Sequence, residues 1–168
     1  MNYIQFVSTI IILLITSYPL LMRYLRRPKL IIEPHCWGPE PNVRLLGFIV
    51  RNVGHNIARG VYGEAEFKAA SGKRHGPHRI CWNDSMKYRI DILPGPLNEC
   101  WFYVARIERK NNTIMRYIGY SFQSGIAEEC LEITVRLRWN YYGLRSLEKK
   151  FLLNLTTWSE SKIDIING

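Results

Sequence analysis

LGFIVRNVGHNIARGVYGEAEF, residues 46–67, decides the fold class of this chain of 168 residues. Apolar runs stand on both sides of a polar insert that extends from Arg51 to Gly60. After the insert, apolar and polar residues alternate from Val61 to Ala69, which is typical of a β-strand with one buried face. A strand that is interrupted by a polar insert and then resumed indicates a chain that crosses between the two sheets of a β-sandwich.

Three residues of this insert have the properties that such a crossing needs. Asn52 is able to bond local backbone where the strand ladder ends. Gly54 permits a positive φ at the turn. Ala58 is small enough to be buried where the crossing chain passes close to the core. We therefore expect Asn52, Gly54 and Ala58 to form a structural turn motif.

The run VRNVGHNIARGV, residues 50–61, resembles the V-x-N-x-G-x-x-x-A-x-x-V signature of immunoglobulin-like, cell-adhesion-related domains of bacteria and archaea. The later run ILPG, residues 92–95, is similar to the L-x-P-G element that follows in such domains. The resemblance covers residues 44–104 and departs from the pattern at 70–88, which is longer and more basic. It implies an immunoglobulin-like fold and no activity, because such sandwiches serve many roles.

Short strands follow one another along the rest of the chain, and we see no amphipathic helix among them. The clearest alternation runs from Leu131 to Trp139, and the hairpin turn Tyr141-Tyr142-Gly143 follows it. Segments 34–41 and 70–77 are expected to be loops. We predict strands at 29–33, 44–52, 61–69, 78–82, 88–93, 100–107, 114–123, 131–139 and 149–157. The predicted fold class is all-β, an immunoglobulin-like antiparallel β-sandwich of seven to nine strands.

The N-terminal 22 residues carry no charged side chain. Residues 4–22 would span about 28 Å as a helix, close to the ~30 Å of a hydrocarbon core. A cleaved signal peptide is the main alternative, but it needs a basic start and a small-residue cleavage site, and neither is present. We therefore predict one transmembrane anchor with its basic flank at 1–27, followed by the sandwich domain at 28–168.

The bases that follow this helix predict its orientation in the membrane. Arg23, Arg26, Arg27 and Lys29 place the downstream domain in the cytoplasm by the positive-inside rule, with an extracellular domain as the alternative. The same four residues are expected to lie at the membrane surface, where each contributes about 1 kcal/mol of attraction to anionic lipid.

Four cysteines depend on this orientation for their redox state. In the cytoplasm Cys36, Cys81, Cys100 and Cys130 should be thiols, several of them buried, whereas outside the cell two disulfides become plausible. N-glycosylation sequons begin at Asn83, Asn111 and Asn154, but the motif is short and carries little weight against the charge flank.

The chain has 23 Lys and Arg against 14 Asp and Glu, a net charge of +9, which favours acidic surroundings such as anionic lipid or nucleic acid. Part of this charge lies around the basic loop, at Lys68, Lys73, Arg74 and Arg79. We interpret these side chains as a solvated surface, and nucleic acid is not an expected partner.

His75, His78 and Cys81, with His35 and Cys36 upstream, are the candidate ligands of a zinc site. Structural zinc needs four converging nitrogen or sulfur ligands, and the usual C-x-x-C pairs are missing from this sequence. We favour a basic loop that enters a strand with a buried Cys81, and we expect no cofactor.

Other signs of chemistry are few. The sequence has no G-x-S-x-G, H-E-x-x-H, Walker A or G-x-G-x-x-G motif, so an enzyme is not expected. Trp101 and Trp139 lie in predicted strands and are expected in the core. Trp37 lies in a predicted loop, where it would suit a sugar-binding platform or the membrane interface.

These features favour a non-catalytic binding or scaffolding module that is held in the lipid bilayer and serves another membrane protein. A pilin-like or cell-surface structural subunit is the first alternative, although the basic residues after the helix would then lie within or beside a filament core. A metal-binding protein or hydrolase is the second alternative and requires His75, His78 and Cys81 to converge. The oligomeric state is left open.

Overall fold

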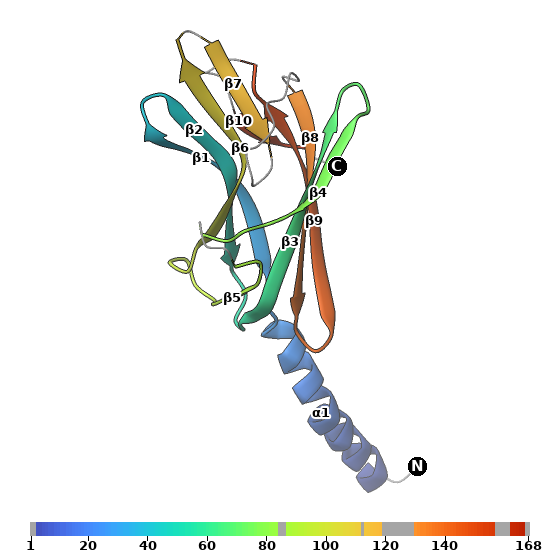
Figure 1. Ribbon diagram of the computed structural model, residues 1–168. Helices are drawn as coiled ribbons and strands as arrows, with labels where there is room; N and C mark the ends of the chain where they lie inside the picture. Colours follow the sequence, from blue (N-terminus) through green and yellow to red (C-terminus); the bar gives the residue numbers. More distant parts are fainter. Residues whose placement is uncertain (1–2, 84–86, 112, 119–129, 157–161, 167–168) are drawn as a thin grey trace.

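The structure, a computed structural model, describes residues 3–83, 87–111, 113–118, 130–156 and 162–166. Over these residues the chain forms one helix and then an antiparallel β-sandwich, as the sequence predicted (Figure 1). The elements are α1 (Tyr3–Leu25), β1 (Leu30–Glu40), β2 (Val43–Asn52), β3 (Ala58–Ala69), β4 (Arg74–Arg79), β5 (Ile90–Ile92), β6 (Cys100–Lys110), β7 (Thr113–Ile118), β8 (Cys130–Asn140), β9 (Leu144–Asn154) and β10 (Lys162–Ile165).

The strands divide between two sheets. The first sheet has the order β1-β2-β6-β7, and the second has the order β10-β9-β8-β3-β4, with β5 paired to β3. The chain passes from the first sheet to the second between β2 and β3, at the polar insert where the sequence predicted a crossing. At one side of the sandwich β10 comes close to β1, so the edges of the two sheets meet there.

The core fills the space between the sheets and is rich in aromatic rings. Phe48 and Phe102 come from the first sheet, and the Phe48 ring packs 4.5 Å from the ring of Phe151 in the second sheet. Trp82, from the segment between β4 and β5, packs edge-on against Phe102 at 5.5 Å. Each of these side chains is fully buried, and burial of such a side chain contributes about 1.5–3 kcal/mol.

Alternation along the strands explains why these residues face inward. Along β3, every second residue from Val61 to Phe67 is buried, whereas Tyr62, Glu64 and Glu66 between them are partly exposed. The same period of two places alternate residues of β8 in the core, with Trp139 at its end, as predicted. The hairpin after β8 turns at 141–143, and β9 then begins at Leu144 rather than at residue 149.

Several predicted boundaries were wrong. Segment 34–41, expected to be a loop, is mostly strand, because β1 continues to Glu40 and pairs Pro34 with Phe48 of β2. This pairing is possible because β1 is an edge strand, where the missing amide hydrogen of proline costs no ladder bond. Segment 70–77 is likewise shorter than expected, since β4 begins at Arg74 and ends at Arg79.

The number of strands also differs from the sequence prediction. The described residues contain ten strands instead of seven to nine, because β10 was not expected; the predicted 88–93 strand is present but shortened to β5. Part of the predicted strand 114–123, residues 119–123, lies outside the described residues, and so does residue 157 of the predicted strand 149–157.

The substitution Gly47→Ala tests the close contact between β2 and β6. The register between these strands shifts at Leu46 and Gly47, and a methyl group on Gly47 would collide with the carbonyl oxygen of Phe102. We expect Gly47→Ala to lower the free energy of unfolding by about 3 kcal/mol, the upper end of the usual cost of overpacking, in urea denaturation of the full-length protein. Gly38→Ala is the matched control, because nothing lies within 4 Å of its added methyl group. Equal urea midpoints for the two variants would contradict the strand register described here.

Candidate functional site at the junction of helix and sandwich

Most of the exposed large hydrophobic side chains of the described chain lie on helix α1. Its segment Gln5–Met22 is long and apolar enough to cross a membrane, and none of it is buried against the sandwich. In Figure 1 the helix extends away from the end of the sandwich where β1 begins and where β3 and the β8–β9 hairpin have their near ends. The candidate functional site lies where the helix meets this end of the sandwich.

Asn52, the last residue of β2, lies at the centre of the junction with no exposed surface. Its Oδ1 accepts hydrogen bonds from the backbone N–H groups of Lys29 and Gly54, both at 3.1 Å. Its Nδ2 donates to the backbone carbonyls of Asn56 at 2.7 Å and Ile92 at 3.1 Å. One side-chain amide therefore ties the chain leaving the helix to the β2–β3 turn and to β5.

The expected bonds from Asn52 to local backbone are present, but the expected conformation of Gly54 is wrong. Gly54 is not among the glycines with positive φ. It is required for space, because a methyl group there would collide with the backbone oxygen of Arg27 and the backbone nitrogen of Lys29. The turn after β2 thus lies directly against the chain that leaves α1. Ala58 is fully buried, as predicted.

The connection between α1 and β1 is short and held on both sides. Only residues 26–29 separate the two elements, and Pro28 among them is buried. The Lys29 carbonyl accepts the N–H of Val53 at 2.8 Å. Asn56 Nδ2 donates to the Arg26 carbonyl at 2.6 Å and to the Tyr141 hydroxyl at 3.2 Å. One network of hydrogen bonds therefore joins the chain that leaves the helix, the β2–β3 turn and the β8–β9 hairpin.

The basic flank of the helix lies around this cluster. The side chains of Arg26, Arg27 and Lys29 are exposed, and the Arg27 guanidinium stacks 4.3 Å from the centre of the Tyr24 ring. The side chain of Arg23 lies outside what the structure describes. Arg145 was not among the residues predicted from the sequence, but it lines a cavity together with Arg27, although 118 positions separate them in the chain. The Tyr-Tyr-Gly hairpin signal at 141–143 marked the turn but gave no sign of this contact.

A second cluster lies on the outer face of the first sheet. The Trp37 ring centre is 5.2 Å from that of Tyr103 and 6.0 Å from that of Trp101, and His35 packs edge-on against Trp37 at 4.5 Å. Both tryptophan predictions were wrong here: Trp37 lies in β1 rather than in a loop, and Trp101 is half-buried rather than in the core. We call His35, Trp37, Trp101 and Tyr103 the aromatic cluster.

The candidate zinc ligands are not brought together. His75 and His78 lie in β4 opposite Phe67 and Ala65, whereas Cys81 is buried beyond the end of that strand. His35 and Cys36 belong to β1 in the other sheet. Within the described ranges, no group of three or more His, Cys, Asp or Glu side chains is placed to hold a metal ion.

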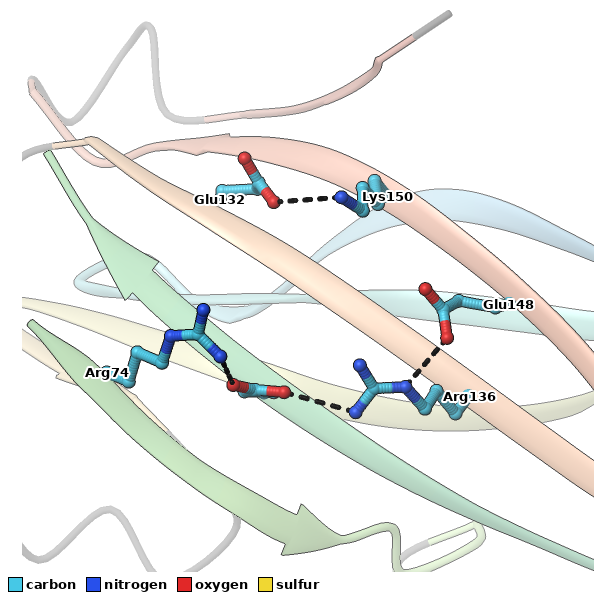
Figure 2. Close-up of polar contacts among 6 residues, drawn as sticks. Arg74, Glu132, Arg136, Glu148 and Lys150 are labelled. Carbon is cyan, nitrogen blue, oxygen red and sulfur yellow. Dashed lines mark hydrogen bonds and ion pairs between the residues drawn. The ribbon is translucent and has the colours of Figure 1, made fainter. Parts of the chain in front are cut away.

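Ion pairs cover the outer face of the second sheet, as Figure 2 shows. Arg136 on β8 lies between Glu66 at 3.1 Å and Glu148 at 2.7 Å, and Arg74 reaches Glu66 at 3.2 Å. The hydrogen bond from Arg136 lowers the pKa of Glu66 below its ordinary value. This face is therefore a charge-compensated surface, and Arg74 of the basic loop is paired within it.

The structure has all four cysteines as free thiols. Only Cys81 is buried, whereas Cys36 and Cys130 are exposed and Cys100 is intermediate. Loss of solvation beside neighbouring groups raises the pKa of the Cys36 and Cys100 thiols, although Cys36 keeps exposed surface, and both stay protonated near neutral pH. Of the sequons, those that begin at Asn83 and Asn111 include residues 84, 85 and 112, which lie outside the described residues.

Comparisons with protein families, with curated proteins and with solved structures found no match to this chain. The resemblance of residues 50–61 to the immunoglobulin-like signature therefore stays a prediction. The structure therefore has three candidate features: a hydrogen-bonded junction at the end of an apolar helix, an aromatic cluster on the first sheet and an outer face of ion pairs on the second sheet.

Asn52→Ala tests the junction. The substitution removes four hydrogen bonds and leaves the Ile92 carbonyl without this partner in a buried site and the Lys29 N–H without it in a partly buried one. We expect a loss of about 3 kcal/mol or more in the free energy of unfolding, measured by urea denaturation of the full-length protein, because an unsatisfied buried polar group costs about 1–3 kcal/mol. Asn42→Ala, in the exposed β1–β2 turn, is the control and should change little. Similar losses in both variants would show that Asn52 is not the centre of the junction.

Proposed function

We propose that the chain is a single-pass membrane protein whose immunoglobulin-like β-sandwich is a non-catalytic binding module for another membrane protein. The observation that carries the proposal is the junction: the apolar helix enters the sandwich through a connection of residues 26–29, which Asn52, Gly54 and Asn56 hold on the β2–β3 turn. A module on such a connection has a fixed height and direction relative to the bilayer, unlike one on a flexible linker.

The binding surface in this proposal is the aromatic cluster on β1 and β6. Solvent-facing positions of a sheet are ordinarily polar, so three large rings gathered on an outer face need a reason. Tryptophan and tyrosine are enriched among the residues that contribute most to protein–protein binding. Arg51 hydrogen-bonds Glu99 at 2.7 Å and pairs with Glu33 beside the cluster, which supplies the polar rim typical of such sites.

The height of the cluster favours a partner that is itself in the membrane. Trp37 lies seven residues after Leu30, where β1 leaves the junction, and seven residues of strand cover about 23 Å. In Figure 1 β1 runs from the helix toward the far end of the sandwich. A membrane protein with a domain of modest height on the same side would meet this surface while both chains diffuse in the bilayer.

The charge flank supports a cytoplasmic location for the sandwich. Arg26, Arg27 and Lys29 follow the apolar helix directly, and basic residues of this kind are retained on the cytoplasmic side. Exposed thiols at Cys36 and Cys130 suit a reducing compartment.

Photocrosslinking in the native membrane tests this function. A photoreactive amino acid at Tyr103 should crosslink to one integral membrane protein that stays in the membrane on alkaline extraction, because Tyr103 lies in the aromatic cluster. The same probe at Lys68, exposed on β3 of the other sheet, is the matched control. Trp37→Ser in the Tyr103 probe variant should weaken the crosslink severalfold.

Three results would contradict the proposal. Extraction of the full-length protein by alkali would show that α1 does not anchor it. Equal crosslinking from Tyr103 and Lys68, or assembly of the purified protein into filaments, would show that the aromatic cluster does not receive a membrane partner.

A further inference from the structure

A cavity of about 300 Å³ lies between the end of α1 and the β8–β9 hairpin. Its walls come from three segments: the last turns of the helix, the chain just beyond it and the hairpin with the start of β9. The lining residues are Leu20, Tyr24, Arg27, Tyr141, Tyr142 and Arg145. The cavity is thus apolar at its helix end, aromatic at its sides and cationic at two points.

The two arginines differ from those on the faces of the sandwich. Arg136 and Arg51 each pair with two carboxylates. Among the residues that the structure describes, neither Arg27 nor Arg145 lies within ion-pair distance of a carboxylate. Two uncompensated guanidinium groups that line one cavity repel each other, so an anion between them lowers the electrostatic energy.

The position of the cavity along the helix indicates the kind of anion. The apolar segment ends at Met22, so Leu20 lies on its hydrocarbon side. Arg27 lies five residues beyond Met22, about 7.5 Å along a helical path, and the headgroup layer of one leaflet is about 5–7 Å thick. The cavity therefore extends from the hydrocarbon boundary across the depth at which lipid phosphates lie.

We propose that this cavity binds the phosphate group of an anionic phospholipid in the adjacent leaflet. This inference rests on the proposed membrane anchoring of α1. Arg27 and Arg145 contact the phosphate oxygens, because the planar guanidinium group matches phosphate in a bidentate geometry. Leu20 lies beside the first carbons of the acyl chains, and the Tyr24 and Tyr142 rings lie at the interface, where tyrosine is enriched in membrane proteins.

Such a lipid would connect the helix to the sandwich at a second place, besides the hydrogen bonds of Asn52. Arg27 belongs to the chain that leaves α1, whereas Arg145 belongs to β9. A phosphate held by both would join the helix to the hairpin on the side of the junction where Asn56 already bonds Tyr141. The orientation of the sandwich on the bilayer would then depend on the lipid composition of the leaflet.

Arg145→Gln is the decisive variant, because Arg145 is exposed and lies outside the helix and its flank, so its loss changes neither the fold nor the predicted topology. The full-length protein in detergent is titrated with short-chain phosphatidylglycerol, short-chain phosphatidylcholine or inorganic phosphate, and binding is followed by native mass spectrometry and thermal shift. The matched control is Arg109→Gln, which removes an equally exposed arginine near the β6–β7 turn, at the end of the sandwich far from α1 (Figure 1).

We expect wild type and Arg109→Gln to bind phosphatidylglycerol more tightly than phosphatidylcholine, and Arg145→Gln to lose about fivefold in affinity for phosphatidylglycerol, the factor that one cation contributes near an anionic surface. Equal binding of the two lipids, or an unchanged affinity in Arg145→Gln, would overturn the proposal. Inorganic phosphate that binds as tightly as phosphatidylglycerol would identify a site for free phosphate instead.

Alkaline extraction of the same variants from membranes separates this inference from the proposed function. Protein that stays in the membrane without a preference for phosphatidylglycerol would overturn the lipid site and leave the anchor intact. Protein that is extracted in every variant would overturn the anchor, and with it the premise of the site.

Discussion

The side-chain amide of Asn52 makes four hydrogen bonds in a place that water does not reach, and the arrangement of helix and sandwich depends on them. A buried amide is stable only when its donors and acceptors are satisfied. Here the partners are backbone groups of residues 29, 54, 56 and 92, which belong to the helix exit, the β2–β3 turn and β5. An aspartate would lose both donor bonds, and an aliphatic residue would lose all four.

Because these hydrogen bonds hold the helix at one end of the sandwich, that near end and the two outer sheet faces have defined positions relative to the helix. Gly54 lets the chain leaving α1 lie against the β2–β3 turn, so the sandwich begins where the helix ends. Arg27 and Arg145 then lie together at the near end, while Trp37 and Tyr103 lie on the outer face of the first sheet, farther along β1. The outer face of the second sheet is neutralised by its own ion pairs, so the two faces differ in what they offer a partner (Figure 2).

Local periodicity was sufficient to predict the β-sandwich, because alternation at 61–69 and 131–139 depends on only one buried face per strand. The importance of Asn52 was visible in the sequence, but its bonds to residues 23 and 40 positions away were not. Trp37 was misplaced because nearby prolines and glycines normally indicate a loop, whereas an edge strand tolerates them. The aromatic cluster required the register of β1, β2 and β6, since 64 positions separate Trp37 from Trp101.

The most direct test of a fixed helix–sandwich junction is a distance distribution measured by double electron–electron resonance in lipid nanodiscs. Spin labels are placed on cysteines introduced at Ser17 on α1 and Lys68 on β3, with the accessible Cys36, Cys100 and Cys130 replaced by serine. A single narrow distribution that broadens in Asn52→Ala is the result predicted here. A broad distribution in the otherwise native chain, unchanged by Asn52→Ala, would show a flexible tether and contradict the account.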